Sequence, residues 1–307
     1  MNEYIDIYSE IKTALEYNQP VVALESTIIS HGMPYPDNID MVQKTGAIIR
    51  RNGAIPATIA LIDGKIKIGL SEEDIYRLAT DKNVKKVSRR DLAYVLAKKE
   101  IGATTVASTM ICAQMGGIKF FVTGGIGGVH RGYEQTMDVS ADLEELAETE
   151  ITVICAGAKA ILDLPRTMEY LETKGVPVIG YQTDVLPAFY TRTSSIPLQL
   201  SANDTHELAS IINTKRSLGL KGGVLVMNPI PAEHSMDEAM INQVIDQAIV
   251  SAAQQGIAGK DVTPYLLKTI VEQTEGQSLK ANMELVFNNA QVGAQLAVAY
   301  YSLRASL

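Results

Sequence analysis

The stretch ITVICAGAKAILDL at residues 151–164 decides the fold class, because a continuous apolar run of strand length passes through Ala-Gly-Ala into a segment with helical spacing. Similar runs alternate with helical segments along the chain: VVAL (21–24), ATIALI (57–62), TTVAST (104–109), KFFVTG (119–124), VPVIGY (176–181) and GGVLVMN (222–228). Such alternation is typical of a sheet covered by helices. We therefore predict an α/β fold in a single large domain over residues 1–307, with residues 1–19 as an N-terminal helical lead-in.

The composition excludes two classes of partner. The chain is 46% hydrophobic with a formal net charge of -8, which opposes the broad positive surface that a nucleic-acid polymer requires. Apolar runs stay shorter than the roughly 18 residues of a membrane span. Cys112 and Cys155 lie in apolar runs and suit buried thiols in a reducing compartment. We expect a cytoplasmic protein with a small-molecule substrate and no membrane or nucleic-acid partner.

The C-terminal part, residues 235–307, predicts a mainly helical region that is rich in Ala, Gln and Val. These helices could form a layer on the sheet, or they could form the surface of an oligomer. The pattern leaves both possibilities open.

Glu25 and Lys159 could carry acid–base and nucleophilic chemistry. Glu25 follows the run VVAL, at the carboxyl end of a predicted strand, where α/β sheets bind ligands. It could move a proton there, or it could simply face water or an ion-pair partner. Lys159 lies among small and apolar residues before a predicted helix. Burial and the positive helix end would favour a neutral amine able to attack a sugar carbon, although its stem could equally cover the core while its head reaches water.

Asp138 and Asp142 in MDVSADLEEL are candidates for holding a divalent cation. Two nearby carboxylates suit Mg²⁺ or Mn²⁺, which keep much of their water shell. The alternative is that Asp142 caps a helix, with Glu145 completing a capping box. Spacing alone leaves both open.

Two further segments could bind phosphate. VKKVSRRD at residues 84–91 gathers basic side chains in an acidic chain, although a solvated surface before a helix is the alternative. TGGIGGVHRG at residues 123–132 offers glycine amides together with His130 and Arg131, or it forms a tight packing turn.

Taken together, the ordered motifs of this chain resemble those of the pseudouridine-5'-phosphate glycosidases, the indigoidine synthase A-like family. The motifs are ALESTIISHGMPYP, KVSRRD, GATTVAST, TGGIGGVHRG, GAKAILDL, GYQT, NPIP and LVFNNA, spread from about residue 20 to about residue 300. The resemblance implies an α/β/α sandwich with a central mixed sheet, usually assembled as a homotrimer.

The resemblance also implies an enzyme, a lyase with glycosidase activity, that reversibly splits the carbon–carbon glycosidic bond of pseudouridine 5'-phosphate. The products would be uracil and ribose 5-phosphate, formed through a lysine imine of the ring-opened sugar in nucleotide breakdown. Lys159 would be the nucleophile, Glu25 the proton donor, and Asp138 the ligand of one Mn²⁺ per subunit. Substrate contacts would come from Lys86, Val106, Ser140, Ala141, Asp142 and Asn282.

Two other functions remain as alternatives. A different lysine-dependent lyase or aldolase acting on a sugar phosphate would use the same groups but would release no uracil. A non-catalytic sugar-phosphate sensor would be expected to lack Lys159 or Glu25, and both are present.

Overall fold

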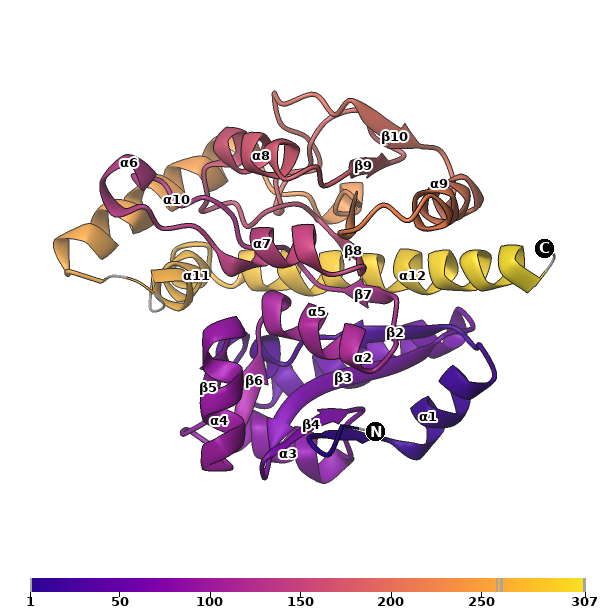
Figure 1. Ribbon diagram of the computed structural model, residues 1–307. Helices are drawn as coiled ribbons and strands as arrows, with labels where there is room; N and C mark the ends of the chain where they lie inside the picture. Colours follow the sequence, from indigo (N-terminus) through magenta and orange to yellow (C-terminus); the bar gives the residue numbers. More distant parts are fainter. Residues whose placement is uncertain (1, 258, 260–261, 306–307) are drawn as a thin grey trace.

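The centre of the molecule is a sheet of mainly parallel strands (Figure 1). The computed structural model describes residues 2–257, 259 and 262–305. The parallel strands lie in the order β3-β2-β7-β8-β11-β9-β10. Their bounds are β2 (Val21–Leu24), β3 (Ile55–Ile62), β7 (Phe120–Val122), β8 (Thr152–Cys155), β9 (Val178–Tyr181), β10 (Leu200–Ala202) and β11 (Val224–Met227). The short runs β2, β7, β8 and β11 are buried at every residue, as strands covered on both faces must be.

Antiparallel pairing on β3 makes the sheet mixed. Strands β4 and β6 both pair antiparallel to β3, and each then pairs with a parallel neighbour, β1 or β5. Their bounds are β1 (Ile5–Ile7), β4 (Lys65–Ile68), β5 (Lys85–Val87) and β6 (Gly102–Thr104). Of the predicted run TTVAST, only Thr104 is in a strand, because Thr105 caps a helix that begins at Val106.

Helices cover both faces of the sheet, as the α/β/α prediction required. On one face, α12 packs against α2 and α9 and against β2, β7 and β8; elsewhere α5 packs against α7 and β3. Their bounds are α2 (Asp37–Arg51), α5 (Val106–Met115), α7 (Ala141–Glu148), α8 (Leu164–Thr173), α9 (Thr205–Ser217) and α12 (Gln277–Ala305). Figure 1 shows α12 running from beside α11, near the middle of the molecule, to the C-terminus at the right.

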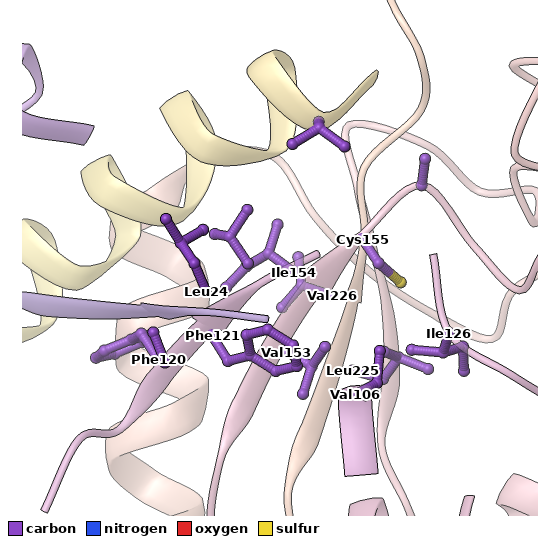
Figure 2. Packing of buried hydrophobic residues seen from close by; sticks show 14 of the residues in the cluster. Leu24, Val106, Phe120, Phe121, Ile126, Val153, Ile154, Cys155, Leu225 and Val226 are labelled. Carbon is purple, nitrogen blue, oxygen red and sulfur yellow. The ribbon is translucent and has the colours of Figure 1, made fainter. Parts of the chain in front are cut away.

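The C-terminal helix α12 is part of the core. Side chains of β2, β7, β8 and β11, including Leu24, Ile154 and Val226, gather between the strands and this helix (Figure 2). At Gly293 the helix comes so close that an added Cβ would lie 2.2 Å from Cγ2 of Val122. The prediction of C-terminal helices is confirmed, and α12 forms a layer on the sheet, while α10 (Glu238–Gln254) and α11 (Val262–Gln273) pack against each other.

The N-terminal lead-in is only partly helical. Helix α1 (Ser9–Glu16) matches the prediction, but strand β1 precedes it and extends the sheet beside β4. The remaining helices are α3 (Glu72–Thr80), α4 (Leu92–Lys98) and α6 (Tyr133–Thr136), with π or 3-10 turns at Ile28–Gly32, Arg89–Asp91 and Ala232–His234. Ser71 opens α3 with a capping box.

Both cysteines are buried and unpaired, as predicted, and burial raises the pKa of each thiol to about 12. Among the described residues, no helix has the length and apolarity needed to span a membrane.

Candidate active site

The residues predicted to carry chemistry lie at the carboxyl ends of β2, β7 and β8. Glu25 directly follows β2, Thr123 follows β7, and the loop that carries Lys159 follows β8. These strands are parallel and adjacent, so the three segments leave the sheet side by side. This edge is where open α/β sheets bind their ligands.

Two adjoining cavities open at this edge. The larger measures about 560 Å³ and the smaller about 70 Å³. Glu25, Lys86 and Lys159 line both, so they stand where the two cavities meet. Every predicted site residue lines one or both: Glu25, Lys86, Val106, Asp138, Ser140, Ala141, Asp142 and Lys159 in the larger, and Asn282 in the smaller.

Lys159 lies in a loop, and the prediction that it stands at a helix start was wrong. Helix α8 begins only at Leu164, so the positive end of a helix does not act on the Lys159 amine. Backbone pairing holds the loop instead: the amide of Lys159 donates to the carbonyl of Ile126 at 3.0 Å, and Asp163 donates to Val129 at 2.9 Å. The half-buried side chain therefore projects from a fixed backbone into both cavities.

Glu25 is oriented by two hydroxyl groups. Thr27 donates to Oε2 of Glu25, and Thr123 donates to Oε1. Because each oxygen has its own donor, the carboxyl group has one preferred orientation at the junction of the cavities.

Asp142 holds three segments together, and of the two possibilities left open for it, the one in which it caps the helix was wrong. Ser140 is the N-cap of α7, accepting from the amide of Asp142 at 3.2 Å, and Ala141 opens the helix. Oδ1 of Asp142 accepts from the amide of Ala107 at 2.9 Å, and Oδ2 accepts from Gly127 at 2.7 Å. An added Cβ at Gly127 would lie 2.2 Å from the Ser140 hydroxyl, so glycine is required there.

Asp138 differs from Asp142 in its surroundings. Its side chain is 38% exposed, and Oδ2 lies 4.0 Å from Nδ1 of His130. Burial lowers the pKa of His130, Asp138 opposes this, and the charges of Lys159 and Lys86 add to the lowering. A neutral imidazole is therefore favoured next to Asp138. No three metal-ligating side chains gather anywhere in the described part of the chain, so a cation here would keep much of its water.

The basic side chains of segment 84–91 differ in role: Arg89 and Arg90 form ion pairs, whereas Lys86 faces the cavities. Arg89 pairs with the buried carboxylate of Glu145 and, at 2.5 Å, with Glu148, so its charge is compensated. Arg90 is 79% exposed and lies 3.5 Å from Asp91. Lys86 sits half-buried on β5 and faces both cavities. Across from it Val106 is the first residue of α5, so the amide-rich start of that helix also borders the larger cavity.

The motifs NPIP and LVFNNA meet behind the smaller cavity. Asn289 is fully buried on α12, and its amide donates to the carbonyl of Thr123 at 2.9 Å. Asn228 donates to Oδ1 of Asn289 at 2.9 Å, and the backbone of Asn228 donates to Cys155 at 2.8 Å. This buried amide pair fixes the ends of β7 and β8 to the helix that presents Asn282.

Arg131 supports the Lys159 loop from outside the larger cavity. It donates to the carbonyl of Ala160 at 3.3 Å and contacts that of Leu162 at 3.5 Å, and it pairs with Asp246 at 2.6 Å. Its neighbour His130 lines the cavity instead. In the glycine segment 123–132, His130 therefore lines the larger cavity, and Arg131 contacts the loop that carries Lys159.

Sequence reasoning missed several lining residues. Thr27 and Thr123 belong to motifs already singled out, so their hydroxyls could have been noticed beside Glu25. Phe189 and Thr263 line the smaller cavity from segments that carry no local motif. Only the folded chain brings these two residues to Lys159.

Comparisons with known proteins find relatives that match nearly the whole chain. The protein-family profile described as "Indigoidine synthase A like protein" matches residues 10–299. A protein of Staphylococcus aureus (strain MW2) named "Pseudouridine-5'-phosphate glycosidase" is 64% identical over 303 residues, 99% of each chain. A protein of the same name from Glaesserella parasuis serovar 5 (strain SH0165) is 59% identical, covering 98% of this chain and 100% of that one.

Solved structures have the same fold. The prealnumycin C-glycosynthase AlnA, determined in complex with ribulose 5-phosphate, has a TM-score of 0.93 and 38% identity over the full length of both chains. An indigoidine synthase A-like protein from Thermotoga maritima has a TM-score of 0.88 and 32% identity, covering 97% of this chain and 96% of that one. The chain is an enzyme and belongs to the family of indigoidine synthase A like proteins.

Proposed function

We propose that the enzyme reversibly cleaves pseudouridine 5'-phosphate into uracil and ribose 5-phosphate through a lysine imine. The observation that carries this proposal is the position of Lys159 and Glu25 at the junction of two cavities with different walls. A nucleophile and an acid at the junction can act on the bond between the sugar and the base. The names of the close relatives support the same reaction.

The walls of the two cavities suggest how the substrate lies. The larger cavity has Lys86, His130 and the start of α5, which suit a phosphate monoester. The smaller cavity has Phe189, Leu267 and the amide of Asn282, which suit a flat base with a polar edge. The sugar then lies between them, beside Glu25 and Lys159.

The reaction needs covalent catalysis because a carbon–carbon bond offers no leaving oxygen or nitrogen to protonate. Glu25 delivers a proton to the ring oxygen as the bond between C1' and that oxygen opens, and the Lys159 amine bonds to C1'. On bonding to C1', the Lys159 nitrogen gives up a proton, which the Glu25 carboxylate takes. The bond between C1' and C5 of uracil then breaks as the nitrogen lone pair moves toward C1', its electron pair stays on C5, and Glu25 delivers that proton to C5. The lysine nitrogen forms the imine with C1'. Water adds to the imine, restores the amine and releases ribose 5-phosphate.

Asp138 is the residue we propose for a divalent cation, Mn²⁺ in this proposal. Its carboxylate is partly exposed in the larger cavity, whereas both oxygens of Asp142 are occupied by backbone amides. One carboxylate with a remaining water shell fits a hard cation. When bound, the cation would order water and phosphate around the sugar.

Product identity tests the proposal. Purified protein is incubated with pseudouridine 5'-phosphate and Mn²⁺, with and without a chelator, and uracil is measured by chromatography. Uracil release that the chelator abolishes would support the reaction and the metal. A sugar-phosphate lyase of another kind would yield no uracil, and a sensor would bind the substrate without turnover.

Borohydride reduction tests the imine. With ribose 5-phosphate present, reduction should attach the reduced sugar phosphate to the peptide that contains Lys159, as seen by mass spectrometry. Attachment elsewhere, or none from an active enzyme, would contradict the imine.

The resemblance further predicts a homotrimer in the cytoplasm. Light scattering of the purified protein would test the assembly, and a monomer at working concentration would contradict it.

A further inference from the structure

Phe189 has a backbone conformation that is unusual for a large side chain. Its φ angle is 67°, in the left-handed region that favours glycine, and its side chain is 2% exposed. A bulky residue keeps such a conformation only where its surroundings impose it, and such residues concentrate at functional sites.

Contacts with the loops that follow β7 and β8 impose this conformation on Phe189. The amide of Phe189 donates to the carbonyl of Ala156 at 3.1 Å. Gly157 has a φ angle of 106°, and an added Cβ there would lie 2.3 Å from the carbonyl oxygen of Pro187. An added Cβ at Gly125 would lie 2.6 Å from Cδ2 and Cε2 of Phe189. The phenyl ring therefore lies against Gly125, which follows β7, while the backbone of residues 187–189 lies against Gly157, which follows β8.

The ring forms part of the wall of the smaller cavity. Phe189, Gly125 and Asn282 line that cavity but are not among the described residues that line the larger one. Glu25 and Lys159 line both cavities, whereas His130 and the start of α5 line only the larger one. Phe189 therefore lies on the side of Glu25 and Lys159 that is away from His130 and the start of α5. Tyr190 packs edge-on against Phe189 with ring centroids 4.8 Å apart, and it is not among the described residues that line either cavity.

We propose that Phe189 is a specificity-determining residue, whose ring limits the smaller cavity to an unsubstituted pyrimidine of the size of uracil. This inference rests on the proposed function. Gly125 lets the ring approach closely, Gly157 lets the backbone of Pro187 and Phe189 approach, and the imposed backbone keeps the ring from withdrawing. A methyl group on the part of the base that meets the ring would then have no space.

The reverse reaction measures this limit directly. The enzyme is given ribose 5-phosphate, Mn²⁺ and either uracil, 1-methyluracil, 3-methyluracil or 6-methyluracil, all of which keep C5 free to bond. The C-nucleotide formed is measured by mass spectrometry. For each variant the rate with a methylated base is divided by the rate with uracil, so a partly folded preparation does not change the ratio.

Phe189→Leu and Phe189→Ala should raise this ratio by about tenfold or more for at least one methylated base, because a methyl group in a tight apolar pocket discriminates by about that factor. Tyr190→Leu is the matched control, since Tyr190 is an equally buried neighbouring aromatic residue at 2% exposure. Its ratios should stay within about threefold of wild type. Unchanged ratios in both Phe189 variants, or equal changes in Tyr190→Leu, would overturn the inference.

Base binding separates this inference from the proposed reaction. Saturation-transfer NMR in the presence of ribose 5-phosphate compares uracil with the methylated bases without requiring turnover. If the wild type catalyses nothing but prefers uracil, and Phe189→Ala loses that preference, the proposed reaction fails and the role of Phe189 stands. If the wild type shows no preference among the bases, the role of Phe189 fails.

Discussion

The larger and smaller cavities share Glu25, Thr27, Lys86, Lys159 and Thr263 but differ in the rest of their walls. The larger is bordered by charged and capping groups, including Asp138, His130 and the start of α5. The smaller is closed by glycine backbone, Phe189 and helix α12. Under the proposed function, this difference lets one junction hold a charged sugar phosphate on one side and a flat base on the other. It also predicts that substitutions in the two cavities will have separable effects.

The largest effect is expected at the junction itself. Lys159→Ala should lower uracil release by about 10³-fold or more, because it removes the proposed nucleophile. Circular dichroism should show an unchanged fold, and Lys268→Ala, whose side chain is 78% exposed, serves as the lysine control. Near-normal turnover by Lys159→Ala would refute the imine mechanism.

A second effect is expected on the phosphate side of the junction, where Lys86 lines both cavities. Lys86→Met should raise the KM for pseudouridine 5'-phosphate by about 10- to 100-fold, as expected for loss of a charged hydrogen bond. The KM for uracil in the reverse reaction should change little. Steady-state kinetics in both directions measure the two values. Lys85→Met is the matched control, since this neighbouring lysine on β5 is exposed and is not among the described residues that line either cavity. Equal changes in both KM values would remove the distinction between the cavities.

The sequence predicted the buried strands of the α/β sheet and the position of Glu25 at the carboxyl end of a strand, but it did not predict the details of the site. Runs such as VVAL and TVIC are buried on both faces, so apolar continuity alone identifies them. Strands β4 and β5 were missed because KIKI and KKV are short and carry charges. The place of Lys159 was misjudged because backbone pairing with Ile126 delays the helix to Leu164, which spacing cannot reveal.

The candidate site, like the fold, could be predicted only in part from the sequence. The residues that the resemblance implied for the site line the two cavities, because the adjacent parallel strands β2, β7 and β8 end at one edge. Asp142 illustrates what could not be predicted, since its partners Ala107 and Gly127 are far away in sequence. Phe189 lacked any signal because its backbone is set by Ala156 and Gly157, which are far away in sequence.

Within the larger cavity, Asp138 and Asp142 should respond in opposite ways. Asp138→Asn should raise the Mn²⁺ concentration needed for half-maximal activity by about 10-fold or more, with little change in melting temperature because the side chain is partly exposed. Asp142→Asn should lower the free energy of unfolding by about 1–3 kcal/mol, because an amide can no longer serve both backbone donors. Metal titrations and thermal melts of the two variants form the test. A metal defect in Asp142→Asn with unchanged stability would exchange the two roles.

The smallest effect is expected in the smaller cavity, at Asn282. Asn282→Ala removes one neutral amide on α12 and should raise the KM for uracil by about 3- to 10-fold, the usual worth of a neutral hydrogen bond. The KM for ribose 5-phosphate should remain that of the wild type, because the substitution leaves the proposed phosphate-binding groups, Lys86, His130 and the start of α5, unchanged. Asn288→Ala is the matched control, since this neighbouring asparagine on α12 donates to Pro229 at 3.0 Å and is not among the described residues lining either cavity. If Asn282→Ala weakened ribose 5-phosphate and left uracil unchanged, the base would have to lie in the larger cavity, and the assignment of the two walls would be reversed.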